Sequence, residues 1–143
     1  MICVKMKKKL ISCLAILAIS VMGAMTAFAA NNVDTGFQFN FSAGQPRRTE
    51  WRAKKDSSNV YMSVQGLTGG FTAHVVGSSS NLNSGMGIDC SRGYTYNIAS
   101  TGVYRMRNWV YDGAPGYGYA AVYASPNYGY GYSAWGVWSP DSI

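Results

Sequence analysis

Apolar and polar residues alternate in one short segment after another from residue 37 to the end of the chain. The segment "FQFNFS" over residues 37–42 has phenylalanine at every second position and polar side chains between them. Such alternation is typical of a β-strand with one buried and one solvated face. No segment after Ala30 keeps the period of an amphipathic helix, so the sequence predicts an all-β domain.

Further segments repeat this alternation, and stretches rich in Gly, Pro, Asn and Ser separate them. They cover residues 49–55, 59–64, 71–76, 93–99, 102–113, 117–125 and 128–139. The charged segment 49–55 is predicted as an edge strand, and 77–87 as a loop. About seven to eight short strands at this spacing predict an antiparallel β-sandwich or a small barrel.

The first 30 residues have a different character. The basic run Lys7–Lys9 precedes an apolar stretch over residues 10–30, and "AFA" at 27–29 provides the small residues of a cleavage site. This pattern predicts a secretory signal peptide over residues 1–29, cleaved after Ala29 or Ala30, and a single all-β domain over 30–143. An uncleaved anchor helix is the alternative, because the apolar stretch is about long enough to span a bilayer. The polar "NNVDTG" that follows favours cleavage and secretion.

Charge and cysteine content restrict the possible partners. Four of the twelve basic residues lie in the first nine positions, so residues 31–143 hold eight basic and six acidic side chains. The remaining charge of +2 does not favour nucleic acid, but it suits weak attraction to anionic polymers of the cell envelope. Cys90 is alone after residue 30 and is predicted as a buried or half-buried thiol; pairing between chains is the alternative.

No arrangement of residues predicts catalysis or a metal. His74, Cys90 and Asp89 are the residue types of a cysteine nucleophile, but their spacing does not support one. The strand pattern instead places His74 on an exposed face. A single His and a single Cys cannot form a zinc site, and the carboxylates show no calcium-loop spacing. No carboxylate pair for glycan hydrolysis stands out. The sequence therefore predicts a non-enzymatic protein without a cofactor.

A basic cluster overlaps the segment 49–55 that is predicted as an edge strand and begins two residues before it. Its members are Arg47, Arg48, Arg52, Lys54 and Lys55. Charges at such a position discourage pairing with other chains, and we expect their neutralisation to raise self-association. Contact with an anionic polymer is the alternative.

Aromatic residues supply the candidate binding surface. Tyr128, Tyr130 and Tyr132 alternate with small residues, and Trp135 and Trp138 follow. Exposed flat rings can stack on sugars, whereas the same rings can fill the core of a sandwich without disulfides. The sequence favours the core and leaves a binding face as the alternative. Arg105 and Arg107 share a predicted strand face with Trp109 and Tyr111, an arrangement that allows cation–π contacts and binding of a sugar or an acidic ligand.

Three segments, "FQFNFS", "RAKKDSSNVYMSV" and "GVWSPDS", resemble a family of small, uncharacterised, exported β-rich proteins of Gram-positive bacteria. The layout is also similar to that of lactococcin-type bacteriocins. The resemblance implies a signal peptide and one β-rich domain, but no functional residue.

We therefore expect a secreted protein that binds a cell-wall glycan or an anionic envelope polymer and meets the membrane only through its leader before cleavage. A bacteriocin-like antagonist and a small glycan hydrolase are the alternatives.

Overall fold

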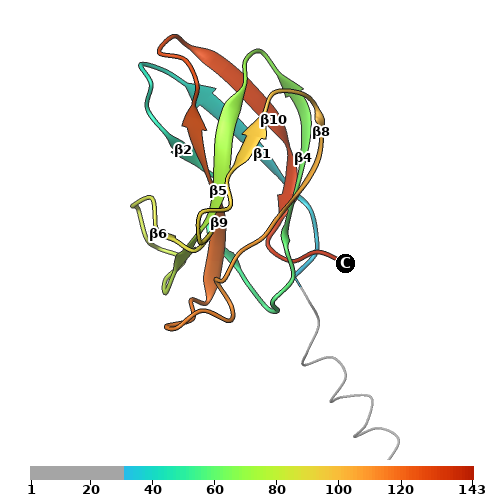
Figure 1. Ribbon diagram of the computed structural model, residues 1–143, viewed down its shortest axis with the longest axis vertical. Coiled ribbons are helices and arrows are strands. Elements are labelled where there is room, and N and C mark those ends of the chain that lie inside the picture. Colours follow the sequence, from blue (N-terminus) through green and yellow to red (C-terminus); the bar gives the residue numbers. More distant parts are fainter. Residues whose placement is uncertain (1–30) are drawn as a thin grey trace, which may run out of the picture.

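A computed structural model describes residues 31–143, which form two packed antiparallel β-sheets (Figure 1). This part of the chain contains no helix, and hence none that could cross a membrane. The predicted signal peptide over residues 1–29 lies outside the described residues. The all-β sandwich that the alternation predicted is confirmed, and the sheets do not close into a barrel.

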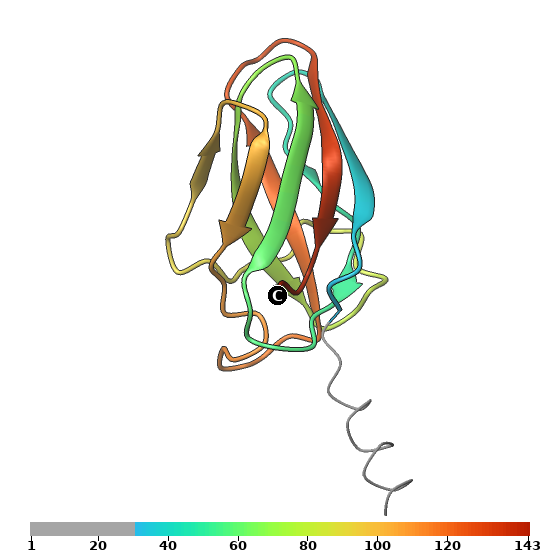
Figure 2. The ribbon, with the colours of Figure 1, turned by 90° about the vertical axis from the view of Figure 1, so that its right-hand side faces the viewer.

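The sandwich has ten strands in the described part of the chain. They are β1 (Thr35–Phe41), β2 (Arg47–Arg48), β3 (Arg52–Ala53), β4 (Val60–Leu67), β5 (Phe71–Ser78), β6 (Ile88–Asp89), β7 (Tyr96–Ile98), β8 (Gly102–Met106), β9 (Tyr119–Pro126) and β10 (Tyr132–Ser139). The four-stranded sheet has the order β1-β10-β4-β8, and its strands lie side by side in Figure 2. The six-stranded sheet has the order β2-β9-β5-β6, with β3 paired to β9 and β7 to β5.

The number of strands exceeds the predicted seven or eight because several strands of the six-stranded sheet are only two or three residues long. The segment 49–55, predicted as one edge strand, contains only the two-residue strand β3, and β2 lies just before it; both pair with β9 at the edge of that sheet. Thr49 lies between them and bonds Val122 of β9 through both its backbone N–H and its hydroxyl oxygen. Of the segment 77–87, predicted as a loop, Gly77 and Ser78 still belong to β5, and residues 79–87 carry the chain on to β6.

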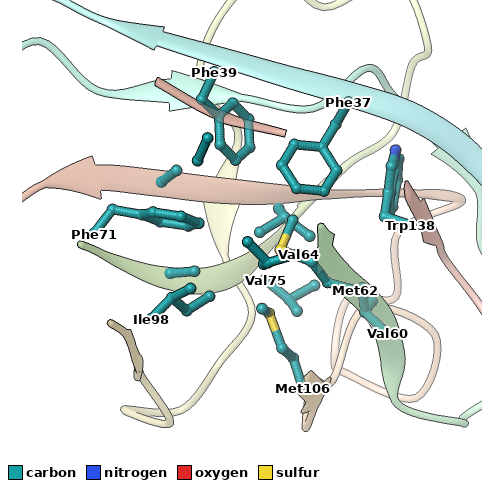
Figure 3. Close-up of a cluster of buried hydrophobic side chains, with 14 of the residues drawn as sticks. Phe37, Phe39, Val60, Met62, Val64, Phe71, Val75, Ile98, Met106 and Trp138 are labelled. Atoms are coloured by element: carbon teal, nitrogen blue, oxygen red, sulfur yellow. The ribbon is translucent and has the colours of Figure 1, made fainter. Parts of the chain in front are cut away.

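The hydrophobic core lies between the sheets. Its β1 face consists of the three alternating phenylalanines, which are buried, while Gln38 and Asn40 between them are exposed. Phe39 meets Phe71 of the opposite sheet edge to face, with ring centroids 5.7 Å apart (Figure 3). Edge-to-face contact is a favourable geometry for aromatic rings. The alternation of β1 therefore positions the core and leaves a polar outer face on the four-stranded sheet.

Two predicted strands have different limits in the structure. The strand expected over 102–113 ends at Met106. The Asn108 side chain donates to the Met106 carbonyl (3.2 Å) and accepts from the Val110 N–H (3.4 Å), so a local turn replaces strand pairing. The alternating tyrosines at 128, 130 and 132 are predicted to lie in one strand, but only Tyr132 does, as the first residue of β10. Residues 127–131 carry the chain from β9 in one sheet to β10 in the other, which interrupts the row of tyrosines.

Candidate binding surfaces

The structure separates the aromatic residues at the chain end into core and surface. Trp138 is fully buried, and Tyr132 is 7% exposed. The Tyr132 hydroxyl donates to the Gly70 carbonyl (2.5 Å) and accepts from the Asn127 N–H (2.9 Å). Burial raises the pKa of this phenol. Trp138 and Tyr132 therefore belong to the framework, and neither can offer its ring face to a ligand.

Tyr128 and Tyr130 form an exposed stack in the loop between β9 and β10. Their ring centroids are 5.1 Å apart with an interplanar angle of 18°. They are 45% and 60% exposed, and the Tyr132 ring supports both from below the surface. The pair forms an aromatic tip at one end of the sandwich.

Trp135 lies on the outer face of the four-stranded sheet. It faces away from the core because it is an odd number of residues from Trp138 and Tyr132, and strand side chains alternate. Its indole packs across Gly66 of the neighbouring strand β4, where a methyl group would overlap the ring. The residue is still 43% exposed. Glycine at position 66 thus lets a large ring pack closely against β4 while a large part of it meets solvent.

A row of polar side chains borders this ring. Gln38 of β1 is the direct cross-strand partner of Trp135, and Asn40 is the partner of Ser133. The Asn40 amide oxygen accepts from Gln38 Nε2 (3.2 Å) and from Ser133 Oγ (3.1 Å). We call the surface of Gln38, Asn40, Gly66, Ser133 and Trp135 the Trp135 face. It offers one flat ring beside several amide and hydroxyl groups with free hydrogen-bonding capacity.

Arg105 and Arg107, predicted on one strand face with Trp109, lie in different surroundings. Arg105 sits over the Tyr61 ring, with Cζ 5.5 Å from the centroid. It lines a hollow of about 190 Å³ near the chain end, together with Asn32, Asp34 and Ile143. Because β8 ends at Met106, Arg107 lies outside the strand and does not share a strand face with Arg105.

Arg107 and Trp109 join two residues from a distant turn. Arg107 Cζ lies 4.5 Å from the Tyr94 ring centroid and 5.6 Å from that of Trp109. Arg92 Cζ lies 4.4 Å from the Trp109 ring centroid. We call these four residues the arginine–aromatic cluster. Sequence reasoning missed Arg92 and Tyr94, because no pattern along the chain links the turn at residues 91–94 to the segment after β8.

The predicted basic cluster is largely engaged within the protein. Arg47 donates to the Asn40 carbonyl (2.9 Å), Arg48 to the Gly85 carbonyl (3.0 Å) and Arg52 to the Trp138 carbonyl (3.2 Å). Lys54 is buried and forms an ion pair, whereas Lys55 is exposed. These side chains tie the sheet edge to its surroundings and leave fewer of their N–H groups free for a polymer.

The residues considered for catalysis are only partly brought together. His74 Nε2 lies 4.0 Å from Asp89 Oδ2, and the His74 ring stacks on Tyr123 with centroids 4.7 Å apart. His74 is thus half-buried rather than fully exposed as its strand pattern predicted. Burial, which would raise the pKa of Asp89, is outweighed by hydrogen bonds from Ser91 and by the nearby His74, so this pKa is lowered.

Cys90 is a buried free thiol, as predicted. Burial, with a further contribution from Asp89, raises its pKa, and a raised pKa keeps the thiol protonated and poorly nucleophilic. Within residues 31–143 no three potential ligands among His, Cys, Asp and Glu gather to hold a metal ion.

Comparison with known proteins gives a family but no activity. No curated protein matches the chain, and no solved structure matches it. One family model matches residues 25–142, which include nearly all of the β-sandwich. The chain belongs to that family, DUF2712, a family of proteins of unknown function.

Proposed function

We propose that this protein is a secreted, non-enzymatic binding protein that attaches to a glycan outside the cell or at the cell envelope through its Trp135 face. The observation that carries the proposal is the half-exposed indole packed against Gly66. A ring held in this way can stack on the apolar face of a sugar ring, while its Nε1–H remains free to donate.

The polar row beside Trp135 supports a sugar ligand over a purely apolar one. Gln38, Asn40 and Ser133 present amide and hydroxyl groups that match sugar hydroxyls as donors and acceptors. The Gln38–Asn40–Ser133 bonds also fix the orientation of these groups before a ligand arrives, which lowers the entropic cost of binding. The face is an open sheet surface, so it suits a long polymer better than a small enclosed molecule.

The location outside the cell rests on the leader pattern at residues 1–29, a basic run followed by an apolar stretch and small residues. A single thiol after residue 30, buried in the structure, agrees with a chain that needs no disulfide for export.

Retention on insoluble glycans tests the proposal. The purified protein is mixed with chitin, β-glucan and bacterial peptidoglycan and washed at about 1 M salt, where the Debye length is about 3 Å and charge attraction is screened. We expect retention on at least one glycan to survive this wash, because stacking does not depend on charge. Trp135→Ala should weaken that retention by about tenfold or more.

Val137→Ala is the matched control, because Val137 lies on the same strand two residues further on and also faces outward. Its retention should equal that of the unmodified protein. The proposal fails if the unmodified protein is retained on none of the glycans, or if Trp135→Ala is retained as well as Val137→Ala. Loss of retention in Tyr128→Ala combined with Tyr130→Ala, but not in Trp135→Ala, would also overturn it and would move the site to the aromatic tip.

A further inference from the structure

The arginine–aromatic cluster is built by two segments that the fold holds firmly together. The Trp109 N–H donates to the Cys90 carbonyl (2.8 Å), and the Arg107 N–H donates to the Tyr96 hydroxyl (2.8 Å). Arg107 Nη1 lies 2.9 Å from the Tyr94 hydroxyl, to which it donates. Three hydrogen bonds between residues far apart in sequence therefore fix the cluster on the scaffold.

The turn that carries Arg92 is tightly defined. The Asp89 carboxylate accepts from the Ser91 N–H (2.8 Å), and the Tyr94 N–H donates to the Ser91 carbonyl (3.0 Å). Arg92 has a φ of +49°, a left-handed conformation that side chains other than Gly, Asn and Asp seldom adopt. In this conformation the Arg92 guanidinium lies over the Trp109 ring, which the Arg107 guanidinium also approaches.

The guanidinium groups of Arg92 and Arg107 differ from those of the other side of the molecule. Arg47, Arg48 and Arg52 donate to protein oxygens. By contrast, Arg107 makes one side-chain hydrogen bond and Arg92 makes none to residues 31–143, and no carboxylate of these residues lies within 4.0 Å of either group. Both positive charges thus lie near the Trp109 ring, and most of their N–H donors face solvent.

We infer that this cluster is a second binding site, independent of the Trp135 face, for an oxyanion carried by an extracellular polymer, either a phosphodiester or a carboxylate. A guanidinium that rests on a ring keeps its N–H edges free, and these edges match two oxygens of a phosphate or a carboxylate. Two guanidiniums around one ring favour a ligand with repeated negative groups, because the gain from each exposed contact is small and several contacts add.

The test measures the affinity of the full chain for three soluble polymers: poly(glycerol phosphate), polygalacturonate and neutral dextran. The variant that carries both Arg92→Gln and Arg107→Gln removes two charges from the cluster. The control that carries both Lys55→Gln and Arg105→Gln removes two exposed charges elsewhere. We expect the cluster variant to lose about tenfold or more in affinity for at least one polyanion, and the control to change by less than about threefold.

Salt and the choice of polymer identify the ligand. Binding of either polyanion by the unmodified protein should weaken steeply as salt is added. The recognised group is a phosphodiester if the cluster variant binds poly(glycerol phosphate) less tightly, and a carboxylate if it binds polygalacturonate less tightly. Equal losses in the two double variants would overturn the site, since net charge alone would then explain binding. No salt-sensitive binding to either polyanion would also overturn it.

A second readout locates the contact on the protein. The indole N–H resonance of Trp109, assigned by its loss in Trp109→Phe, should shift on addition of the polyanion. Binding without that shift would contradict the site. Binding to neutral glycans should stay unchanged in the cluster variant and fail only with Trp135→Ala, so the two sites can be tested separately.

Discussion

At the scale of single residues, glycines on β4 and β10 decide how closely these strands approach. The register of β10 against β4 shifts between Trp135 and Gly136. A Cβ atom at position 136 would overlap the Ser63 carbonyl oxygen and lie 3.0 Å from the Gln65 nitrogen. Both are backbone atoms of the paired strand, so they cannot move aside without loss of pairing.

We therefore expect Gly136→Ala to lower the free energy of unfolding by about 2 kcal/mol or more, in the range of overpacked sites. Urea unfolding followed by circular dichroism measures the change. Gly129→Ala is the control, because nothing lies within 4 Å of a methyl group there, and it should be neutral or slightly stabilising. Equal effects of the two substitutions would show that the close approach at Gly136 does not limit stability.

At the scale of strands, the alternation of apolar and polar residues predicts where a strand lies and which side is buried better than it predicts the first and last residue of the strand. The segment 71–76 is predicted as a strand, and β5 covers Phe71–Ser78 with Phe71, Ala73 and Val75 buried. The parity of Trp135 and Trp138 likewise indicates that they lie on opposite faces. The ends at Met106 and Tyr132 depend on a side-chain turn and on a crossing between sheets, which local alternation does not record. The arginine–aromatic cluster could not be predicted from the sequence for the same reason, because tertiary contacts bring its two segments together.

The two edges of the four-stranded sheet are protected differently. Along β1, Arg47 bonds the Asn40 carbonyl and Arg52 bonds the Thr35 hydroxyl, so side chains from β2 and β3 occupy that edge. The second edge is β8, whose outer side pairs with no strand of residues 31–143, and Val103 on this strand is 54% exposed. Arg105, two residues on, is the charge on this open edge.

We expect Arg105→Val to promote association of the protein through β8, since an apolar unpaired edge can add a strand from another molecule. Sedimentation velocity over a range of protein concentrations should show dimers or larger species. Asp112→Val is the control, because it exposes the same side chain in a turn, away from the open edge and from the basic cluster at residues 47–55. If both variants associate to the same extent, apolar exposure rather than the β8 edge is the cause.

At the scale of the whole molecule, a buried charge network joins the two ends of the described chain. Asp141 and Lys54 are fully buried at their side chains and lie 2.7 Å apart. The second Asp141 oxygen accepts from the N–H groups of Asn31 (2.7 Å) and Lys55 (3.0 Å). Lys54 also donates to the Ser58 carbonyl (2.6 Å). One carboxylate thus holds the start of the sandwich, the segment after β3 and the final residues in a single arrangement.

Asp141→Asn keeps the shape of this network but leaves the Lys54 charge in the interior without its closest partner. Removing one member of a buried ion pair costs about 3–5 kcal/mol, and for a domain of this size each kcal/mol lowers the Tm by about 4 °C. Asp112→Asn at an exposed position should leave the Tm nearly unchanged. Lys54→Met combined with Asp141→Asn should cost less than the sum of the two single substitutions, because no uncompensated charge then stays buried. Additive losses, measured by calorimetry, would show instead that the backbone hydrogen bonds to Asp141, and not its charge, hold the ends of the chain together.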